Sequence, residues 1–170
     1  LSKKFIYTVL ATIFLIGGLI GYNYYNKIFG SSVTKDTIIF VYSSDSLTDI
    51  KEKIAKVSSS PNTFLFVSAI KKFSIPKTGR YLIKKGMSNN DVVNILKSGR
   101  QIAVNVSFNN QDTLEKFAGR IAVQLEIDSA SIVNSFIDKD FLSQNGLTEK
   151  SVLQICIPNS YQFYWNVTAA

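Results

Sequence analysis

The stretch "GRYLIKKGMSNNDVVNILKSG" (residues 79–99) indicates the fold class, because a predicted strand runs directly into a predicted helix. Residues 80–84 combine aromatic and aliphatic side chains behind a turn, which is typical of a strand. Ser88, followed three residues later by Asp91, predicts a capping box at the start of the helix. Gly99 predicts its C-terminal stop. The buried stripe of this helix is predicted at Val92, Ile95 and Leu96.

The residues before this stretch predict a strand followed by two helices. Residues 37–42, "TIIFVY", are β-branched and aromatic and predict a strand. Ser46, or Thr48 just after it, can cap a helix that runs to about Lys56. The breaker "SSSPN" (58–62) then introduces a second helix that ends near Phe73. The resulting order of strand, helix, helix and strand resembles a LysM module.

The residues after this stretch predict one more strand and a run of helices. In residues 102–108, "IAVNVSF", apolar and small or polar residues alternate, which is typical of a half-buried strand. From Asp112 to Glu126, apolar residues recur with a helical period. A further helix precedes a short turn that ends at Gly146. The predicted caps are Asp112 with Glu115, then Asp128, and Asp140 for the turn. The fold class is therefore α+β.

The N-terminal segment predicts a membrane anchor. Residues 5–26 carry no charge, and as a helix they would span about 33 Å, which matches a hydrocarbon core of about 30 Å. A tyrosine cluster (Tyr22, Tyr24 and Tyr25) suits the membrane interface. A cleaved signal peptide is the alternative, but no small-residue cleavage site follows. Lys3 and Lys4 favour a cytoplasmic N-terminus, with the remaining chain outside the inner membrane. The first residue is Leu, which suggests a fragment or a processed form.

Composition excludes several functions. The chain has no histidine, which excludes Ser-His-Asp catalysis and most zinc sites. Cys156 is its only cysteine, and no cofactor is expected. The net charge is +7, and residues 71–100 hold most of the excess, with eight basic residues against Asp91. Such a region can attract an anionic membrane or an anionic polymer, or can simply be a solvated surface. Nucleic acid is not an expected partner, because the anchor places this surface outside the cytoplasm.

These segments together resemble the YceG-like family of endolytic murein transglycosylases (MltG). Two family motifs carry the resemblance, a G-x-Y-x-[IL]-x-x-G-M-S segment and a [FI]-P-[DN]-T-Y element. The matching residues are Gly79, Tyr81, Ile83, Gly86, Met87 and Ser88, and then Ile157, Pro158, Asn159, Ser160 and Tyr161. The continuation "FYWN" (163–166) resembles the Bacteroidetes-type branch. Two departures are Leu153-Gln154, where many members have Glu-Gly, and "NNQ" (109–111), where many have Pro-Glu-Gly.

The resemblance implies a division into four segments. Residues 1–26 would be a cytoplasmic stub and transmembrane helix, and residues 27–36 a linker. Residues 37–108 would form the LysM-like βααβ module with the helix and strand that follow it. Residues 109–170 would be the N-terminal part of a mixed α/β transglycosylase domain.

The resemblance also implies an activity, which is cleavage of the β-1,4 bond between N-acetylmuramic acid and N-acetylglucosamine in nascent peptidoglycan to give 1,6-anhydro ends. One carboxylic acid protonates the leaving oxygen, and in the family that acid lies in a later A-S-[IV]-[IV]-E-K-E segment. We therefore expect the catalytic acid beyond residue 170 and an inactive 170-residue chain. Polar and aromatic side chains suited to binding glycan are Asn159, Tyr161, Gln162 and Trp165.

The expected partners are peptidoglycan glycan strands and the inner membrane, with peptidoglycan synthases as further candidates. A non-enzymatic LysM-like glycan-binding or scaffold protein of the envelope remains the alternative. A pyridoxal-phosphate lyase, an older label attached to this family, is disfavoured because no glycine-rich phosphate loop is present.

Overall fold

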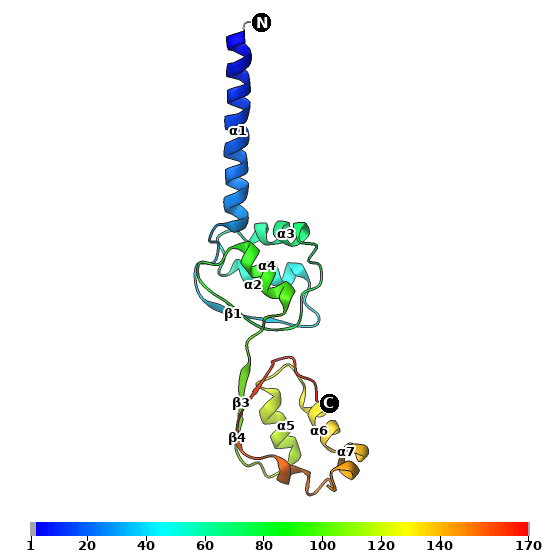
Figure 1. Ribbon diagram of the computed structural model, residues 1–170. Helices are drawn as coiled ribbons and strands as arrows, with labels where there is room; N and C mark the ends of the chain where they lie inside the picture. The colour runs from blue at the N-terminus through cyan, green and yellow to red at the C-terminus, as the bar shows by residue number, and fades with distance from the viewer. Residues whose placement is uncertain (1–2, 170) are drawn as a thin grey trace. The chain divides into compact units, whose positions relative to one another are not determined.

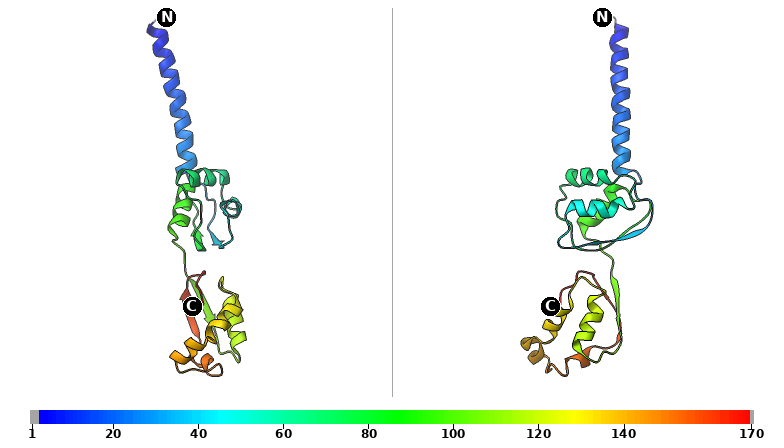
Figure 2. Two further views of the ribbon diagram at one scale, coloured as in Figure 1. Left: turned by 90° about the vertical axis from the view of Figure 1, so that its right-hand side faces the viewer. Right: turned by 180° about the vertical axis from the view of Figure 1, so that it is seen from behind.

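The computed structural model describes residues 3–169 and confirms an α+β chain with a long apolar helix at its N-terminus (Figures 1 and 2). In chain order the elements are α1 (Lys3–Phe29), β1 (Thr37–Val41), α2 (Leu47–Ala55), α3 (Pro61–Ile70), β2 (Gly79–Ile83), α4 (Asn89–Ser98), β3 (Val104–Phe108), α5 (Leu114–Ala122), α6 (Ser129–Phe136), α7 (Lys139–Gln144), the 3-10 helix η1 (Val152–Ile155) and β4 (Asn159–Phe163).

The chain forms two compact units. The first unit contains residues up to 39, 44–77 and 82–100, and the second unit contains residues 40–43, 78–81 and those from 101 on. The strand β3 pairs with β4 and so lies in the second unit. The predicted segment boundaries at 36 and 108 stay predictions.

The helix α1 has the length and composition of a membrane span. Its most apolar 18-residue window has a mean hydropathy of 2.0 and none of that window is buried. The tyrosines predicted for the interface, such as Tyr24 and Tyr25, lie in its last turns and are exposed. The helix is therefore compatible with the predicted single-pass anchor.

Residues 37–83 follow the predicted order of strand, helix, helix and strand, and β1 and β2 pair in a two-stranded sheet. Ser46 caps α2, because its Oγ accepts from the Asp49 backbone N–H while the Asp49 carboxylate accepts from the Ser46 N–H at 2.8 Å. Periodic apolar residues from the helices and β2 meet in one core. The side chains buried there to 0% exposure are Ile50, Ile54, Phe64, Ile83, Val92, Val93 and Leu96.

The helix α4 confirms the predicted caps. The Ser88 Oγ accepts from the Asp91 N–H at 3.1 Å, and the Asp91 carboxylate accepts from the Ser88 N–H at 3.0 Å. Gly99 closes the helix at a φ of 74°, in the left-handed region that glycine favours, and donates its N–H to the Ile95 carbonyl. The predicted stripe was partly wrong, because Val93 is fully buried whereas Ile95 is only half-buried.

The second unit is built on an antiparallel ribbon of β3 and β4, with α5 against β3 and α6 against α5. Val104 lies opposite Phe163 and Phe108 lies opposite Asn159. The sequence did not predict β4, because its polar residues and the preceding Pro158 are typical of a loop. Its strand conformation depends on pairing with β3, which precedes it by some fifty residues in the chain.

Two predicted caps were wrong. Thr113, not Asp112, is the N-cap of α5, and its Oγ1 accepts from the Lys116 N–H at 3.3 Å. Asp112 instead forms an exposed ion pair with the Lys116 ammonium at 3.0 Å. Likewise Asp138, not Asp140, caps α7. In both helices the residue with extended or non-helical backbone just before the first turn takes the cap, and the neighbouring carboxylate does not.

The helix α5 is also shorter than predicted, since it ends at Ala122 instead of Glu126. The Gln124 side chain folds back to donate to the Arg120 carbonyl at 2.7 Å. The Glu126 N–H donates to the Trp165 carbonyl and is therefore used outside the helix. These tertiary hydrogen bonds replace the last predicted helical turn, although Leu125 still points into the core at 8% exposure.

Candidate functional site

The β3–β4 ribbon has two chemically different faces. Because side chains alternate along a strand, the register places Val104, Val106 and Phe108 on the same face as Tyr161 and Phe163. The opposite face is polar, and its residues are Asn105, Ser107, Ser160 and Gln162. On that face the Ser107 and Ser160 hydroxyls form a hydrogen bond of 2.7 Å. The β4 residues that belong to the second family motif, Asn159, Ser160 and Tyr161, are thus divided between the polar and the apolar face.

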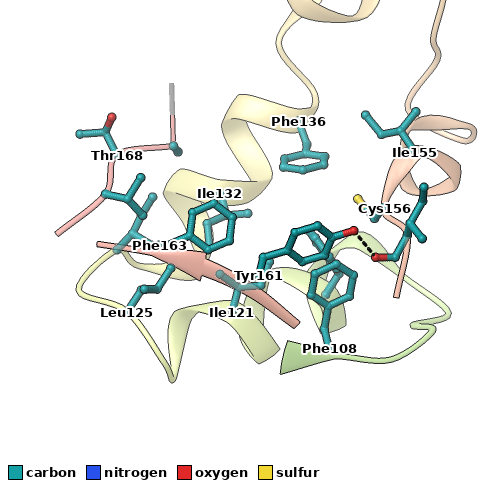
Figure 3. Close-up of a pocket in the computed structure, with 15 residues that line it drawn as sticks. Phe108, Ile121, Leu125, Ile132, Phe136, Ile155, Cys156, Tyr161, Phe163 and Thr168 are labelled. Carbon is teal, nitrogen blue, oxygen red and sulfur yellow. Dashed lines mark hydrogen bonds between the residues drawn. The ribbon is translucent and has the colours of Figure 1, made fainter. Parts of the chain in front are cut away.

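The apolar face opens into a pocket of about 350 Å³ that lies entirely within the second unit (Figure 3). Tyr161 points into it, with its ring stacked on Phe108 at a centroid distance of 5.7 Å. The Tyr161 hydroxyl donates to the Ile157 carbonyl at 2.9 Å. The remaining lining comes mostly from aliphatic and aromatic side chains, such as Ile132 and Phe136. This pocket therefore suits apolar groups better than sugar hydroxyls.

A second hollow at the end of the ribbon is polar, and we call it the polar depression. Its volume is about 480 Å³, and its lining residues are Ser107, Phe108, Asn109, Arg120, Pro158, Asn159 and Ser160. It combines one guanidinium, two carboxamides and two hydroxyls. No carboxylate is among the described residues that line it. Such a set of groups can bind a neutral polar ligand or a carboxylate.

The structure does not bring the four predicted glycan-binding residues together. Asn159 lines the polar depression, and its Oδ1 accepts from the Ser160 N–H at 2.7 Å. Tyr161 lies in the apolar pocket. Gln162 lies on the polar face of the ribbon, opposite Asn105. Of the four, only Asn159 is placed in the depression.

Trp165 has a packing position. It is 5% exposed, and the rings of Phe40 and Tyr42 meet it edge-on at 5.0 and 4.8 Å. Neighbouring Asn166 donates to Thr78 and accepts from the Gln101 amide at 2.9 Å. Protein rings therefore cover the Trp165 indole, and its direct contact with glycan stays a prediction.

Two of the carboxylates that the sequence assigned to helix starts, Glu115 and Asp128, accept hydrogen bonds there. Hydrogen bonds from its own backbone and from Thr113 hold the pKa of Glu115 below its ordinary value. Hydrogen bonds from Ser131 lower the pKa of Asp128 in the same way. A general acid for glycoside cleavage needs the opposite shift, toward a raised pKa. We therefore assign neither residue a catalytic role.

The surroundings of the single cysteine favour a structural role over a reactive one. Cys156 lines the apolar pocket, and burial raises the pKa of its thiol, which disfavours the reactive thiolate. Within residues 3–169, no group of three or more His, Cys, Asp or Glu side chains is arranged to hold a metal ion.

Two residues of the polar depression were missed by sequence reasoning. Arg120 lies within the helix expected from Asp112 to Glu126 and gives no signal of a site, and Asn109 belongs to the departure "NNQ" (109–111) from the family pattern. A basic residue on the exposed face of a helix carries no signal by itself. The available signal was that Asn109 directly follows a predicted strand, at a position where loop side chains often gather.

Comparison with known proteins identifies the family. The model of the YceG-like family matches residues 39–170, so the chain belongs to the YceG-like family and the predicted resemblance is confirmed. No curated protein matches the chain. A crystal structure from Listeria monocytogenes that is described as yceG-like is 18% identical, with a TM-score of 0.49. The match covers 81% of this chain and 50% of that one, so this chain spans about half the length of that protein.

Proposed function

We propose that the whole protein is a membrane-anchored endolytic lytic transglycosylase that cleaves the β-1,4 bond between N-acetylmuramic acid and N-acetylglucosamine in nascent peptidoglycan. The observation that carries this proposal is membership of the YceG-like family over residues 39–170. The polar depression supports it, because it contains the groups that a glycan needs for positioning. The products would carry 1,6-anhydro ends.

In this proposal the polar depression positions glycan and does not donate the proton. Carboxamides such as Asn109 and Asn159 can bind N-acetyl and hydroxyl groups. The Arg120 guanidinium can form paired hydrogen bonds with a carboxylate, such as the lactyl group of a muramoyl residue. Binding energy from such positioning groups lowers the barrier by holding the scissile bond close to the acid.

We further propose that α1 spans the inner membrane once, with its N-terminus in the cytoplasm. The length and hydropathy of α1 support the span, and Lys3 and Lys4 support the orientation. The remaining chain would then lie on the periplasmic side. This location matches the place where nascent peptidoglycan and its synthases are found.

The first unit supports a second candidate function. The order of strand, helix, helix and strand in residues 37–83 resembles that of a LysM-like glycan-binding module, and a basic hollow of about 530 Å³ includes Lys84, Lys85 and Arg100. A non-enzymatic envelope protein that only binds peptidoglycan would use this module alone. An enzyme could use it to remain on the strand that it cuts.

The binding test compares two basic residues of α5. Arg120→Gln removes the cation that lines the depression, whereas Lys116→Gln removes an equal charge one turn earlier, from an exposed ion pair with Asp112. We expect Arg120→Gln, but not Lys116→Gln, to weaken retention of the full chain on uncrosslinked glycan strands. Equal losses of retention in the two variants would show that only the net charge matters. The polar depression would then have no part in glycan binding.

The activity test separates the two candidate functions. The whole protein is incubated with uncrosslinked glycan strands, and the reducing ends are analysed by mass spectrometry. The transglycosylase predicts 1,6-anhydromuramoyl ends. Retention on the same strands without anhydro ends would favour the scaffold.

A further inference from the structure

The helix α3 exposes an apolar stripe beside the end of the candidate membrane span. Its buried side is formed by Phe64, Val67 and Ser68. The opposite side includes Phe66 at 45% and Ile70 at 59% exposure, with Ala69 between them. Exposed apolar residues grouped on one side of a short helix indicate an interaction surface.

Contacts within the first unit fix the level of this stripe along α1. Both α3 and α4 contact α1, and α3 lies beside the end of α1 in all views (Figures 1 and 2). The rings of Phe66 and Tyr24 are 6.1 Å apart. Tyr24 is five residues from the end of α1 at Phe29, or about 7 Å along the helix axis. Phe66 is therefore placed at the aromatic end of the span, where the membrane interface is expected.

The charges around the stripe suit an anionic surface. Lys27 follows the tyrosine cluster, and its Nζ lies 5.9 Å from the centroid of the Tyr24 ring. Lys71 and Lys72 follow α3 directly, and Lys72 is exposed. In the sequence, no acidic residue occurs between Glu52 and Asp91. Apolar side chains flanked by lysines are the pattern of helices that lie in the interfacial plane of a membrane.

We propose that the exposed stripe of α3, formed by Phe66, Ala69 and Ile70, lies in the headgroup region of an anionic phospholipid bilayer and seats the first unit on the membrane surface. The stripe acts as a second membrane contact beside α1. It would fix the orientation of the module that follows the span. This inference rests on the proposed anchoring by α1 but not on the proposed glycan cleavage.

The test uses the full chain in nanodiscs of equal parts phosphatidylcholine and phosphatidylglycerol. In a Cys156→Ser background, an environment-sensitive fluorophore is attached to Ile70→Cys, and quenching by a lipid with a nitroxide high on its acyl chain is measured. We expect a blue-shifted emission that the nitroxide lipid largely removes. The matched control is Glu52→Cys on α2, an exposed position in the same unit, which should remain aqueous and unquenched.

Further arms separate the other outcomes. The same label at Leu15→Cys in α1 reports the anchor itself. One outcome is that the nitroxide lipid quenches the label at position 15 while the label at position 70 stays as exposed to water as the label at position 52. In that case α1 is in the membrane, and the proposed contact of α3 with the bilayer is wrong. If quenching at position 70 appears only in discs that hold two copies, a second copy covers the stripe and the proposal also fails.

Lys72→Gln should reduce quenching at position 70 in anionic discs but not in discs of phosphatidylcholine alone. Equal quenching in anionic discs of the chains with Lys72 and with Lys72→Gln would show that the Lys72 charge does not contribute to the contact with the bilayer.

Discussion

The two sheets among the described residues, β1–β2 and β3–β4, differ in how deeply their side chains are buried. Along β2, residues alternate between buried and half-buried, with Tyr81 and Ile83 at 0% exposure. Along β4 every residue is exposed, and Tyr161 and Phe163 retain 36% and 37% of their surface. Tyr81 and Ile83 are thus fully buried, whereas Tyr161 and Phe163 line an open pocket. In the residues described, β4 keeps two chemically distinct faces that both remain accessible.

The largest difference is expected when the tyrosine in the middle of each strand is replaced by alanine. Tyr81→Ala should destabilise the protein by about 3–5 kcal/mol, because a fully buried aromatic side chain leaves a cavity. Tyr161→Ala should cost only about 1 kcal/mol, because its ring is already partly in water. Hydrogen exchange of the full chain in mild detergent, resolved by mass spectrometry, measures both. Equal costs would show that β4 is as well covered as β2.

A second comparison concerns helix caps in the two units. Ser88→Ala removes a cap that is 3% exposed and part of a reciprocal box, and we expect a loss of about 1–2 kcal/mol. Thr113→Ala removes an exposed cap with a single hydrogen bond of 3.3 Å, and we expect about 0.5 kcal/mol. Hydrogen exchange within α4 and α5 provides the readout. A larger loss at Thr113 would contradict the importance assigned to burial of the cap.

The first unit could be predicted from sequence because its signals are local. The caps at Ser46 and Ser88 and the stop at Gly99 each depend on residues within one or two turns. The site could not be predicted in the same way. Whether Tyr161 and Gln162 share a face is decided by pairing with β3, and whether Trp165 is buried is decided by Phe40 and Tyr42 from far earlier in the chain. Composition indicated that polar and aromatic side chains gather in residues 157–166, but it could not divide that segment into polar and apolar sides.

A third prediction tests how the second unit holds the edge of β3. The Gln124 amide bonds both backbone groups of Ser107, accepting from its N–H at 3.0 Å and donating to its carbonyl at 3.1 Å. Gln124→Ala should cost about 1 kcal/mol and should speed hydrogen exchange at Ser107. Gln111→Ala is the control, because the hydrogen bonds described for the Gln111 side chain join it to nearby Asn109. Unchanged exchange in Gln124→Ala would mean that the ribbon holds its edge without this amide.

The smallest expected effect is a dependence on pH that belongs to the second unit. Hydrogen bonds from Ser131 lower the pKa of Asp128 below its ordinary value of 3.8, so the folded state favours the ionised cap. The stabilisation is complete well above pH 3.8 and is lost as pH falls through the lower pKa of the folded protein. Asp128→Asn keeps a side-chain acceptor for the helix end but does not titrate. Between neutral and acidic pH, the midpoint temperature of thermal unfolding should therefore fall less steeply for Asp128→Asn than for the parent chain. Hydrogen bonds with Ser46 likewise lower the pKa of Asp49, which completes the capping box of α2, so Asp49→Asn measures the corresponding dependence in the first unit. Identical pH profiles for the parent and Asp128→Asn would show that the α6 cap contributes no measurable pH dependence.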